Sequence, residues 1–208
     1  AGRPAEAAAR HGGSRVEVAG VNSPSATVLA GDPDAVEACL AGLAAQGVPA
    51  HRVAMGVASH TAHCETLLPE LGEALAGIRP LPPRVPLLST VTAAPLTDGP
   101  GAGYWRRNLR EPVRFADAVG RVLDDGPAVF LEVGPHPVLG RAIAETAAAR
   151  GLDAARAPVC ASLRRGQDAR AALLQTAARL HRVGVAVVRG GYLLTVGALA
   201  GVVFVPGP

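Results

Sequence analysis

His60 lies where a general base could act on a substrate. It follows the run HRVAMGVAS, which predicts a strand, and it precedes a segment with helical periodicity. Open α/β sheets bind ligands at the carboxyl ends of their strands. The positive end of the following helix disfavours the imidazolium form, and a neutral imidazole can accept a proton. His60 is therefore a candidate general base, and the alternative is a capping or surface histidine.

His60, His63 and Cys64 form a second possible constellation, because residues three and four apart share a helix face and could bind a metal ion. A further ligand is hard to find, since neither His51 nor His136 belongs to a ligand-like pair. This spacing favours a metal site less than a base. Cys64 is a weak candidate nucleophile, because only His60 lies near enough to activate its thiol.

A histidine base needs a nucleophile, and the strand-turn-helix elbow GxSxG that would present a serine is absent from these residues. The nearest string, GGSRV around Ser14, lacks the second glycine and a preceding apolar strand. The chain thus holds a candidate base and no candidate nucleophile.

Residues 16–57 predict a small α+β unit. Two short β-branched runs, a helix beginning after Asp32 and ending at Gly47, and the alternating run 51–57 follow one another in the order ββαβ. This order is compatible with a split βαβ sandwich.

Beyond residue 60, strand and helix patterns alternate, which predicts a parallel sheet covered by helices. AVFLEVG at 128–134 is almost continuously apolar, as is typical of a strand buried on both faces. The other predicted strands are 85–92 and 159–163. Four further helices are predicted. The first is capped by Thr61 and has the apolar stripe Leu68, Leu71, Leu75 and Ile78, and the second starts near Pro112 with Phe115, Val119, Val122 and Leu123 facing inward. The third has Val138, Leu139, Ile143 and Ala147 inward, and the fourth, over 167–183, has Leu173, Leu174, Ala177 and Leu180 on its apolar face.

Composition excludes several classes of protein. Apolar residues make up 49% and charged residues 18% of the 208, so a core can form and disorder of the whole chain is excluded. The net charge is only +3, no run of five basic residues occurs and aromatics are 3%, which argues against nucleic-acid binding. The apolar C-terminal run is shorter than the roughly 20 residues that span a bilayer.

The cysteines indicate the cellular compartment of the chain, and the first residues indicate how the sequence begins. Three widely spaced cysteines without a CxxC pair predict neither a disulfide framework nor a zinc ribbon, and favour a reducing cytoplasm. The first residues have no apolar segment of a signal peptide and no initiator Met, so we expect a segment cut from a longer chain.

Four ordered segments between about residues 16 and 183 resemble the C-terminal half of the acyltransferase domains of modular type I polyketide synthases, in the malonyl-CoA:acyl carrier protein transacylase-like superfamily. They are VNSPSATVLAGDPDAVEACLAGLAAQGVPAHRVAMGVASHTAH, VPLLSTVTAAPL, YWRRNLREPVRFADAV and FLEVGPHPVLG. The resemblance implies part of an α/β-hydrolase-like parallel-sheet core with a ferredoxin-like α+β subdomain. Such domains move an extender acyl group from coenzyme A to a serine, and then to the phosphopantetheine arm of an acyl carrier protein.

The resemblance also assigns roles to residues. The family's base is the last residue of a four-residue motif, here VASH, so His60 takes that role. A main-chain carbonyl orients the family's histidine, and the matching residue is Asn108. The serine of the family's GHSxG elbow, the arginine for the extender carboxylate and the oxyanion-hole amides are expected before residue 1. This chain alone is therefore expected to be inactive.

Val57, Ala58 and Ser59 of the same motif match the family's extender pocket. In the family, HAFH accompanies malonyl extenders and YASH methylmalonyl extenders, and VASH agrees with the second at its last three positions. A phenylalanine beside the histidine would fill the space of an α-methyl group, whereas Ser59 leaves it open. We expect methylmalonyl first, and Val57 in place of tyrosine could admit a longer branch.

The resemblance divides the chain into five segments: a truncated segment at 1–15, the ferredoxin-like subdomain at 16–57, the acyltransferase core at 58–163, a linker helix at 164–184 and an atypical apolar tail at 185–208. The implied partners are extender acyl-CoA and the acyl carrier protein and ketosynthase domains of the same synthase, with no directly bound cofactor, metal, nucleic acid or membrane. Two rival functions are a non-catalytic carrier-protein docking module and a metal-dependent hydrolase using His60 and His63.

Overall fold

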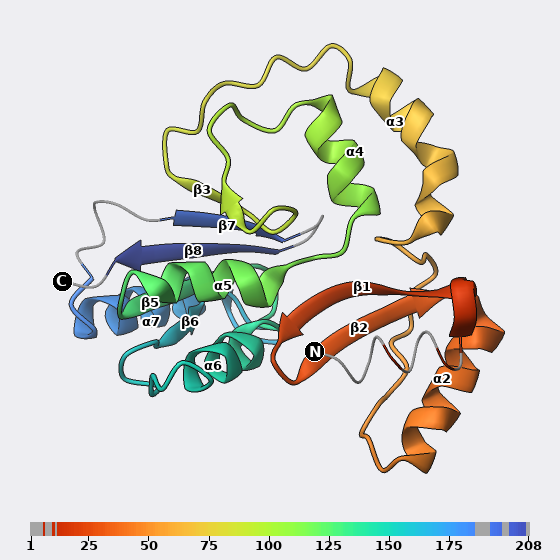
Figure 1. Cartoon of the computed structure of the whole chain (residues 1–208). Helices are drawn as coiled ribbons and strands as arrows, with labels where there is room; N and C mark the ends of the chain where they lie inside the picture. Colours follow the sequence, from red (N-terminus) through yellow and green to blue (C-terminus); the bar gives the residue numbers. More distant parts are fainter. Residues whose placement is uncertain (1–5, 7–9, 11, 186–191, 197–199, 207–208) are drawn as a thin grey trace. The chain divides into compact units, whose positions relative to one another are not determined.

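The chain divides into two compact units. Figure 1 labels their helices and strands. The structure is a computed structural model and describes residues 6, 10, 12–185, 192–196 and 200–206. The first unit comprises Ala1–Val21, Ser25–Pro80 and Pro100–Val113, and the second comprises Asn22–Pro24, Leu81–Gly99 and Arg114–Pro208.

The first unit contains the predicted ββα arrangement. Strands β1 (Val16–Ser23) and β2 (Ala26–Gly31) pair in a two-stranded sheet, and helix α2 (Pro33–Ala45) follows. Ala35 and Cys39 of α2 pack with Val16 of β1, and burial raises the pKa of the Cys39 thiol. Helix α2 begins directly after Asp32, as predicted, with Pro33 as its first residue, but the Asp32 side chain accepts no capping hydrogen bond. The hydrophobic face of α2 therefore fixes the helix on the sheet.

The strand predicted for residues 51–57 is not formed. All seven residues are exposed, and Val53, Met55 and Val57 are 60–70% accessible. An alternating apolar pattern makes a strand only where a neighbouring strand completes its hydrogen bonds, and the described residues provide none beside this segment. The predicted ββαβ order is therefore ββα, and the ferredoxin-like subdomain is not established.

The segment after Thr61 begins as a tight helix. Thr61 accepts a hydrogen bond from the His63 backbone N–H and caps the 3-10 helix η3 (Ala62–Leu67), which leads into α3 (Leu68–Ala74). The helix predicted from the apolar stripe Leu68 to Ile78 is longer than the observed one, because α3 ends at Ala74 and Ile78 is exposed.

The region predicted to hold one helix starting near Pro112 contains two helices. Helix α4 (Ala102–Arg110) ends before Glu111, and α5 (Phe115–Asp124) starts three residues after Pro112. Glu111 is extended because a proline disfavours the helical conformation in the residue before it. The predicted inward residues of α5, Phe115, Val119, Val122 and Leu123, are all buried.

A six-stranded mixed sheet forms the second unit, in the order β4-β3-β7-β8-β5-β6. Its strands are β3 (Leu87–Ser89), β4 (Ala94–Pro95), β5 (Ala128–Val133), β6 (Val159–Ala161), β7 (Tyr192–Val196) and β8 (Ala200–Pro206). The pairs β3–β7 and β5–β6 are parallel, but β8 runs antiparallel to both β5 and β7. The sheet is thus not purely parallel, because the antiparallel pair β7–β8 from the C-terminal tail lies between β3 and β5.

Helices α5, α6 (Gly140–Ala148) and α7 (Ala169–Arg182) contribute to the core around β5. Phe130 of β5 is fully buried, as are Phe115 and Ile143, in agreement with the predicted buried strand. Such side chains each contribute about 1.5–3 kcal/mol of burial free energy. None of the helices in the described part of the chain is long and apolar enough to cross a membrane.

The inward face of α7 differs from the predicted one. Leu173 and Leu174 are exposed, and the buried face is formed by Ala172, Thr176 and Leu180. Thr176 fixes this register, because its hydroxyl donates to the Ala161 carbonyl at 2.6 Å. Val138, also predicted inward, is exposed.

Candidate active site

His60 has a strained backbone held by two hydrogen bonds. Its φ of 63° lies in the left-handed region, which is unfavourable for a residue with a Cβ by roughly 1–2 kcal/mol. Its N–H donates to the Leu109 carbonyl at 3.0 Å, and its ring Nδ1 lies 3.0 Å from the Glu111 carbonyl oxygen. Both acceptors lie at the C-terminal end of α4, Leu109 in its last turn and Glu111 directly after it. Strain at a non-glycine residue, sustained by its surroundings, is typical of functional sites.

The contact with Glu111 selects one form of the imidazole. A carbonyl oxygen only accepts hydrogen bonds, so Nδ1 carries the hydrogen and donates it. In the neutral ring Nε2 then holds the lone pair. The side chain of His60 is half-buried, so it combines a fixed tautomer with an accessible base.

The carbonyl that faces the His60 ring is that of Glu111 and not that of Asn108, to which the family resemblance gives this role. Asn108 lies inside α4, where backbone carbonyls point along the helix axis, and its side chain is buried. Glu111 is extended, so its carbonyl is free to face the ring. Sequence reasoning missed Glu111, although Pro112 marks the residue before it as non-helical.

Residues 109–113 contain both carbonyls that accept from His60, and we call them the acceptor segment. This segment is paired with strand β1. Val113 donates to the Ala19 carbonyl at 2.9 Å, and Val21 donates to the Val113 carbonyl at 2.8 Å. Gly20 allows this close approach, because a Cβ there would lie 3.2 Å from that of Val113. The backbone of β1 therefore holds the end of this segment, at Val113, in place.

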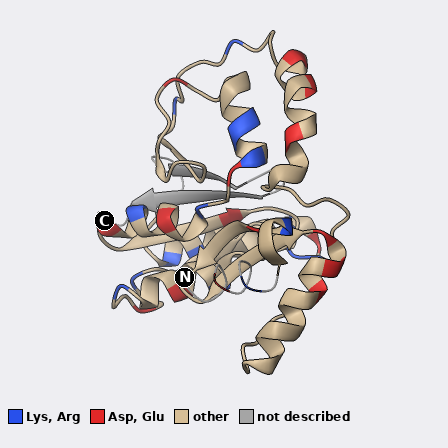
Figure 2. Cartoon of the chain, turned by 45° about the vertical axis from the view of Figure 1, so that its right-hand side comes forward, with Lys and Arg blue, Asp and Glu red and all other residues tan. Residues whose placement is uncertain are grey.

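Charged side chains surround both the turn that carries His60 and the end of α4 that supplies its acceptors. Acidic residues lie in the first turns of η3 and α3, basic residues occupy the last turn of α4, and α4 packs beside both helices (Figure 2). Arg110 donates from Nε to Glu65 at 2.8 Å and lies 3.2 Å from Glu17 of β1. The hydrogen bond with Glu65, together with the charges of Glu17 and Glu65, raises the pKa of the Arg110 guanidinium.

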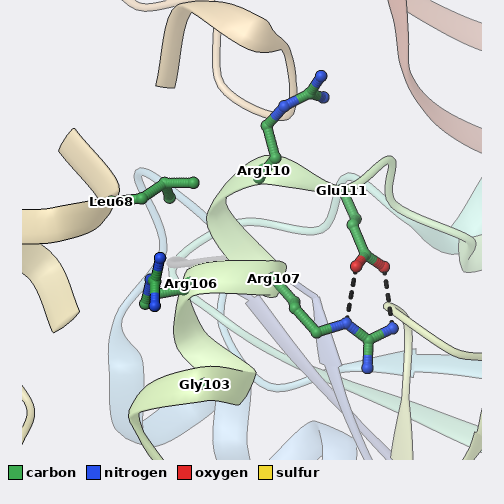
Figure 3. A pocket seen from close by; sticks show the side chains of 6 residues that line it. All are labelled: Leu68, Gly103, Arg106, Arg107, Arg110 and Glu111. Carbon is green, nitrogen blue, oxygen red and sulfur yellow. Dashed lines mark hydrogen bonds and ion pairs between the residues drawn. The ribbon is translucent and has the colours of Figure 1, made fainter. Parts of the chain in front are cut away.

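A hollow of about 210 Å³ lies along this face of α4. Glycine and three arginines recur there at helical spacing, and the hollow is lined by Leu68, Gly103, Arg106, Arg107, Arg110 and Glu111. Arg107 holds the Glu111 carboxylate through two parallel hydrogen bonds of 2.7 and 3.1 Å, and Arg106 lies beside Leu68 on the other side of the helix (Figure 3). This bidentate contact anchors the residue whose carbonyl faces His60.

The other predicted site residues lie as follows. Ala58 and Ser59 are half-buried and Val57 is exposed, directly before His60. His63 contacts the Asp32 carboxylate at 3.2 Å, and the buried Cys64 thiol donates to the Ala58 carbonyl at 3.6 Å.

The metal-binding arrangement considered from the sequence has no counterpart in these contacts. In the described part of the chain, no group of three or more His, Cys, Asp or Glu side chains could hold a metal ion. His51 is exposed, and His136 of the second unit accepts a hydrogen bond from the Arg165 N–H.

The sequence matches the acyl transferase domain family over residues 2–187. This chain belongs to that family. It is 47% identical over 166 residues to 5-methyl-1-naphthoate synthase of Streptomyces sahachiroi, covering 79% of this chain and 9% of that protein. A polyketide synthase system protein for spectinabilin from Streptomyces orinoci is 45% identical over 168 residues, covering 80% of this chain and 9% of the relative.

Solved structures give the same family. The acyltransferase domain from module 8 of the salinomycin polyketide synthase superposes with a TM-score of 0.83 at 38% identity, covering 89% of this acyl transferase chain and 43% of that one. A malonyl-CoA:acyl carrier protein transacylase from Xanthomonas oryzae pv. oryzae gives 0.69 at 29% identity, covering 84% and 54%. The chain thus spans about half or less of these solved structures, and about a tenth of the length of the two relatives from Streptomyces.

The left-handed backbone conformation of His60 predicts which of two variants, His60→Gly or His60→Ala, is the more stable. Alanine and glycine both remove the imidazole, but only alanine keeps the Cβ that disfavours this conformation. We expect His60→Gly to have a free energy of unfolding about 1 kcal/mol higher than His60→Ala, measured by urea denaturation. The control is Ala38→Gly in the middle of α2, which should instead lose about 1 kcal/mol relative to Ala38. A more stable alanine at both positions would contradict the account.

Proposed function

We propose that these residues are part of a polyketide synthase acyltransferase that loads an α-branched extender, methylmalonyl first, from coenzyme A onto an acyl carrier protein. The main observation that supports this proposal is the 3.0 Å contact of His60 Nδ1 with the Glu111 carbonyl, which leaves Nε2 available as a base. The membership in the acyl transferase domain family and the named activity of the Xanthomonas transacylase support the same reaction.

The reaction proceeds by two acyl transfers. His60 Nε2 takes the proton of a serine hydroxyl, and the serine oxygen attacks the thioester carbonyl of the extender. Collapse of the tetrahedral intermediate breaks the C–S bond, and the imidazolium returns the proton to the thiolate of coenzyme A. The carrier's phosphopantetheine thiol then attacks the serine ester in the same manner. Ketosynthase and carrier domains of the same synthase are the proposed partners, and the chemistry needs no further cofactor.

The oriented histidine differs from that of a Ser-His-Asp triad. The Glu111 carbonyl fixes the tautomer that a carboxylate would fix, but it stabilises the imidazolium less because it carries no full charge. The nearest carboxylate on this segment, that of Glu111 itself, is neutralised by Arg107. The proposed base thus depends on orientation more than on an adjacent negative charge.

Extender choice is proposed to depend on volume beside His60. Ser59 is small, and a phenylalanine at this position would occupy the space of an α-methyl group. Burial of one methyl is worth about 0.8 kcal/mol, and a pocket shaped around it discriminates by about 1–3 kcal/mol. We therefore propose a real but incomplete preference for methylmalonyl over malonyl.

The isolated 208-residue chain should not be acylated by extender thioesters, because no elbow serine is present in it. Intact-protein mass spectrometry after incubation with methylmalonyl-CoA would show the acyl adduct if it formed. Stable acylation of this chain at any residue would contradict the proposed division of the catalytic groups.

His60→Ala in an intact domain that includes these residues should lower the rate of acylation by orders of magnitude, because a serine hydroxyl is a weak nucleophile without its base. His63→Ala and Cys64→Ala are the matched variants, and both should be much milder. The measurement is rapid-quench acylation by radiolabelled extender thioester. An equal loss in His63→Ala would instead favour a two-histidine metal site, which metal analysis of the purified domain would test.

Ser59→Phe in the intact domain should shift extender preference toward malonyl, because the ring removes the space for the branch. Competition between malonyl and methylmalonyl thioesters gives the ratio of their kcat/KM values directly. Ser59→Ala is the control and should keep the branched preference. A wild-type preference for malonyl would refute this part of the proposal.

A further inference from the structure

One ion pair links the two segments that hold His60. On one side, the N–H of Ala62, two residues after His60, donates to Glu17 Oε1 at 2.6 Å. On the other side, the second oxygen of the same carboxylate lies 3.2 Å from Nη1 of Arg110. Glu17 therefore contacts the turn that carries the imidazole and the segment that accepts its hydrogen bonds.

Arg110 stands between the two acceptors of His60. The carbonyls of Leu109 and Glu111, its neighbours on either side, accept from the His60 backbone N–H and face its ring Nδ1. A displacement of Arg110 thus moves both acceptors together. The side chains of Arg110 and Glu17 are 28% and 33% exposed, so water screens this pair less than it screens more exposed pairs such as Arg52–Glu37.

Backbone pairing places Glu17 where it can make this connection. Glu17 lies on β1, and Val113, three residues after Arg110, pairs with Ala19 and Val21 of the same strand. The strand gives the spacing of the two segments, and the carboxylate closes the remaining gap to the Ala62 N–H. Charge-assisted hydrogen bonds of this kind are stronger and more directional than neutral ones.

We propose that the Glu17–Arg110 ion pair is a positioning element that keeps His60 in its left-handed conformation and its Nδ1 on the Glu111 carbonyl. The role rests on the proposed function of His60 as the base, and neither residue touches the reacting atoms. Within the described residues, loss of the pair leaves the turn connected to the acceptor segment only by the two hydrogen bonds of His60 and by the Arg110–Glu65 contact. The imidazole then loses its single tautomer, and a base that is misplaced by about 1 Å can lower a rate by roughly a hundredfold.

Two readouts separate positioning from a merely structural role. The first is the His60 tautomer in the 208-residue chain, read from the ¹⁵N chemical shifts of labelled histidine at about pH 8.5, where histidine side chains are ordinarily neutral. His60→Ala identifies the signal by its disappearance. The second is kcat and KM of acyl transfer in the intact domain. The variants are Glu17→Gln, which keeps the shape but removes the charge, and Arg110→Gln.

Both variants should show His60 as a mixture of tautomers, with kcat lowered about tenfold or more and KM within about twofold of the wild type. Arg52→Gln is the matched control, because it removes the Arg52–Glu37 pair of 3.0 Å in the same unit without touching His60. It should leave the tautomer and both constants unchanged. If Glu17→Gln fails to fold, Arg110→Lys replaces it and should give an intermediate effect.

An unchanged Nδ1–H tautomer in the folded variants would overturn the inference, whether or not kcat falls. An unchanged kcat would overturn it as well. The failure of the proposed function has a different signature: His60→Ala would then retain acyl transfer in the intact domain. In that case the tautomer measurement still decides whether the ion pair positions the ring.

Discussion

The contact between the His60 ring and a backbone carbonyl is the constraint on which the site depends. The acceptor is available because α4 ends at Arg110 and Glu111 is extended before Pro112. A proline thus acts on the chemistry indirectly, since it removes one residue from the helix and exposes its carbonyl. The strained backbone of His60 persists because the Leu109 and Glu111 carbonyls both accept hydrogen bonds from this residue, and because Thr61, the next residue, caps η3.

Strand β1 unites these parts of the first unit. Its inward residues pack against α2, its backbone pairs with Val113, and its Glu17 side chain reaches the turn after His60. One short strand therefore serves packing, register and positioning at once. Residues 51–57 form no strand in the described chain, so the backbone before His60 is irregular. The position of His60 is therefore fixed by hydrogen bonds from residue 58 onward, such as that from the Thr61 hydroxyl to the Ala58 carbonyl.

The second unit shows how a buried polar group organises a turn. Glu132 lies on β5 and is almost wholly buried, yet its carboxylate accepts from the Val138 and Leu139 N–H groups ahead of α6. A buried carboxylate without such donors would be strongly unfavourable. The turn after β5 is thereby ordered by a side chain of the strand that precedes it.

Local sequence patterns were sufficient to predict those features that are determined by the residues of a single helix or strand. The ββα order, the buried strand 128–133, the inward face of α5 and the Thr61 cap could all be obtained from periodicity and capping residues. These features depend on neighbours a few residues apart, which a sequence displays directly.

Features that depend on distant partners were not obtainable in this way. The run 51–57 alternates like a strand but forms none, because pairing needs an adjacent strand and not a pattern. The acceptor of His60 was placed at Asn108 and is Glu111, because the last residue of α4 decides which carbonyl is free. The roles of Glu17 and Arg110 were invisible in the sequence, since their meeting is produced by the pairing of β1 with a segment more than ninety residues away.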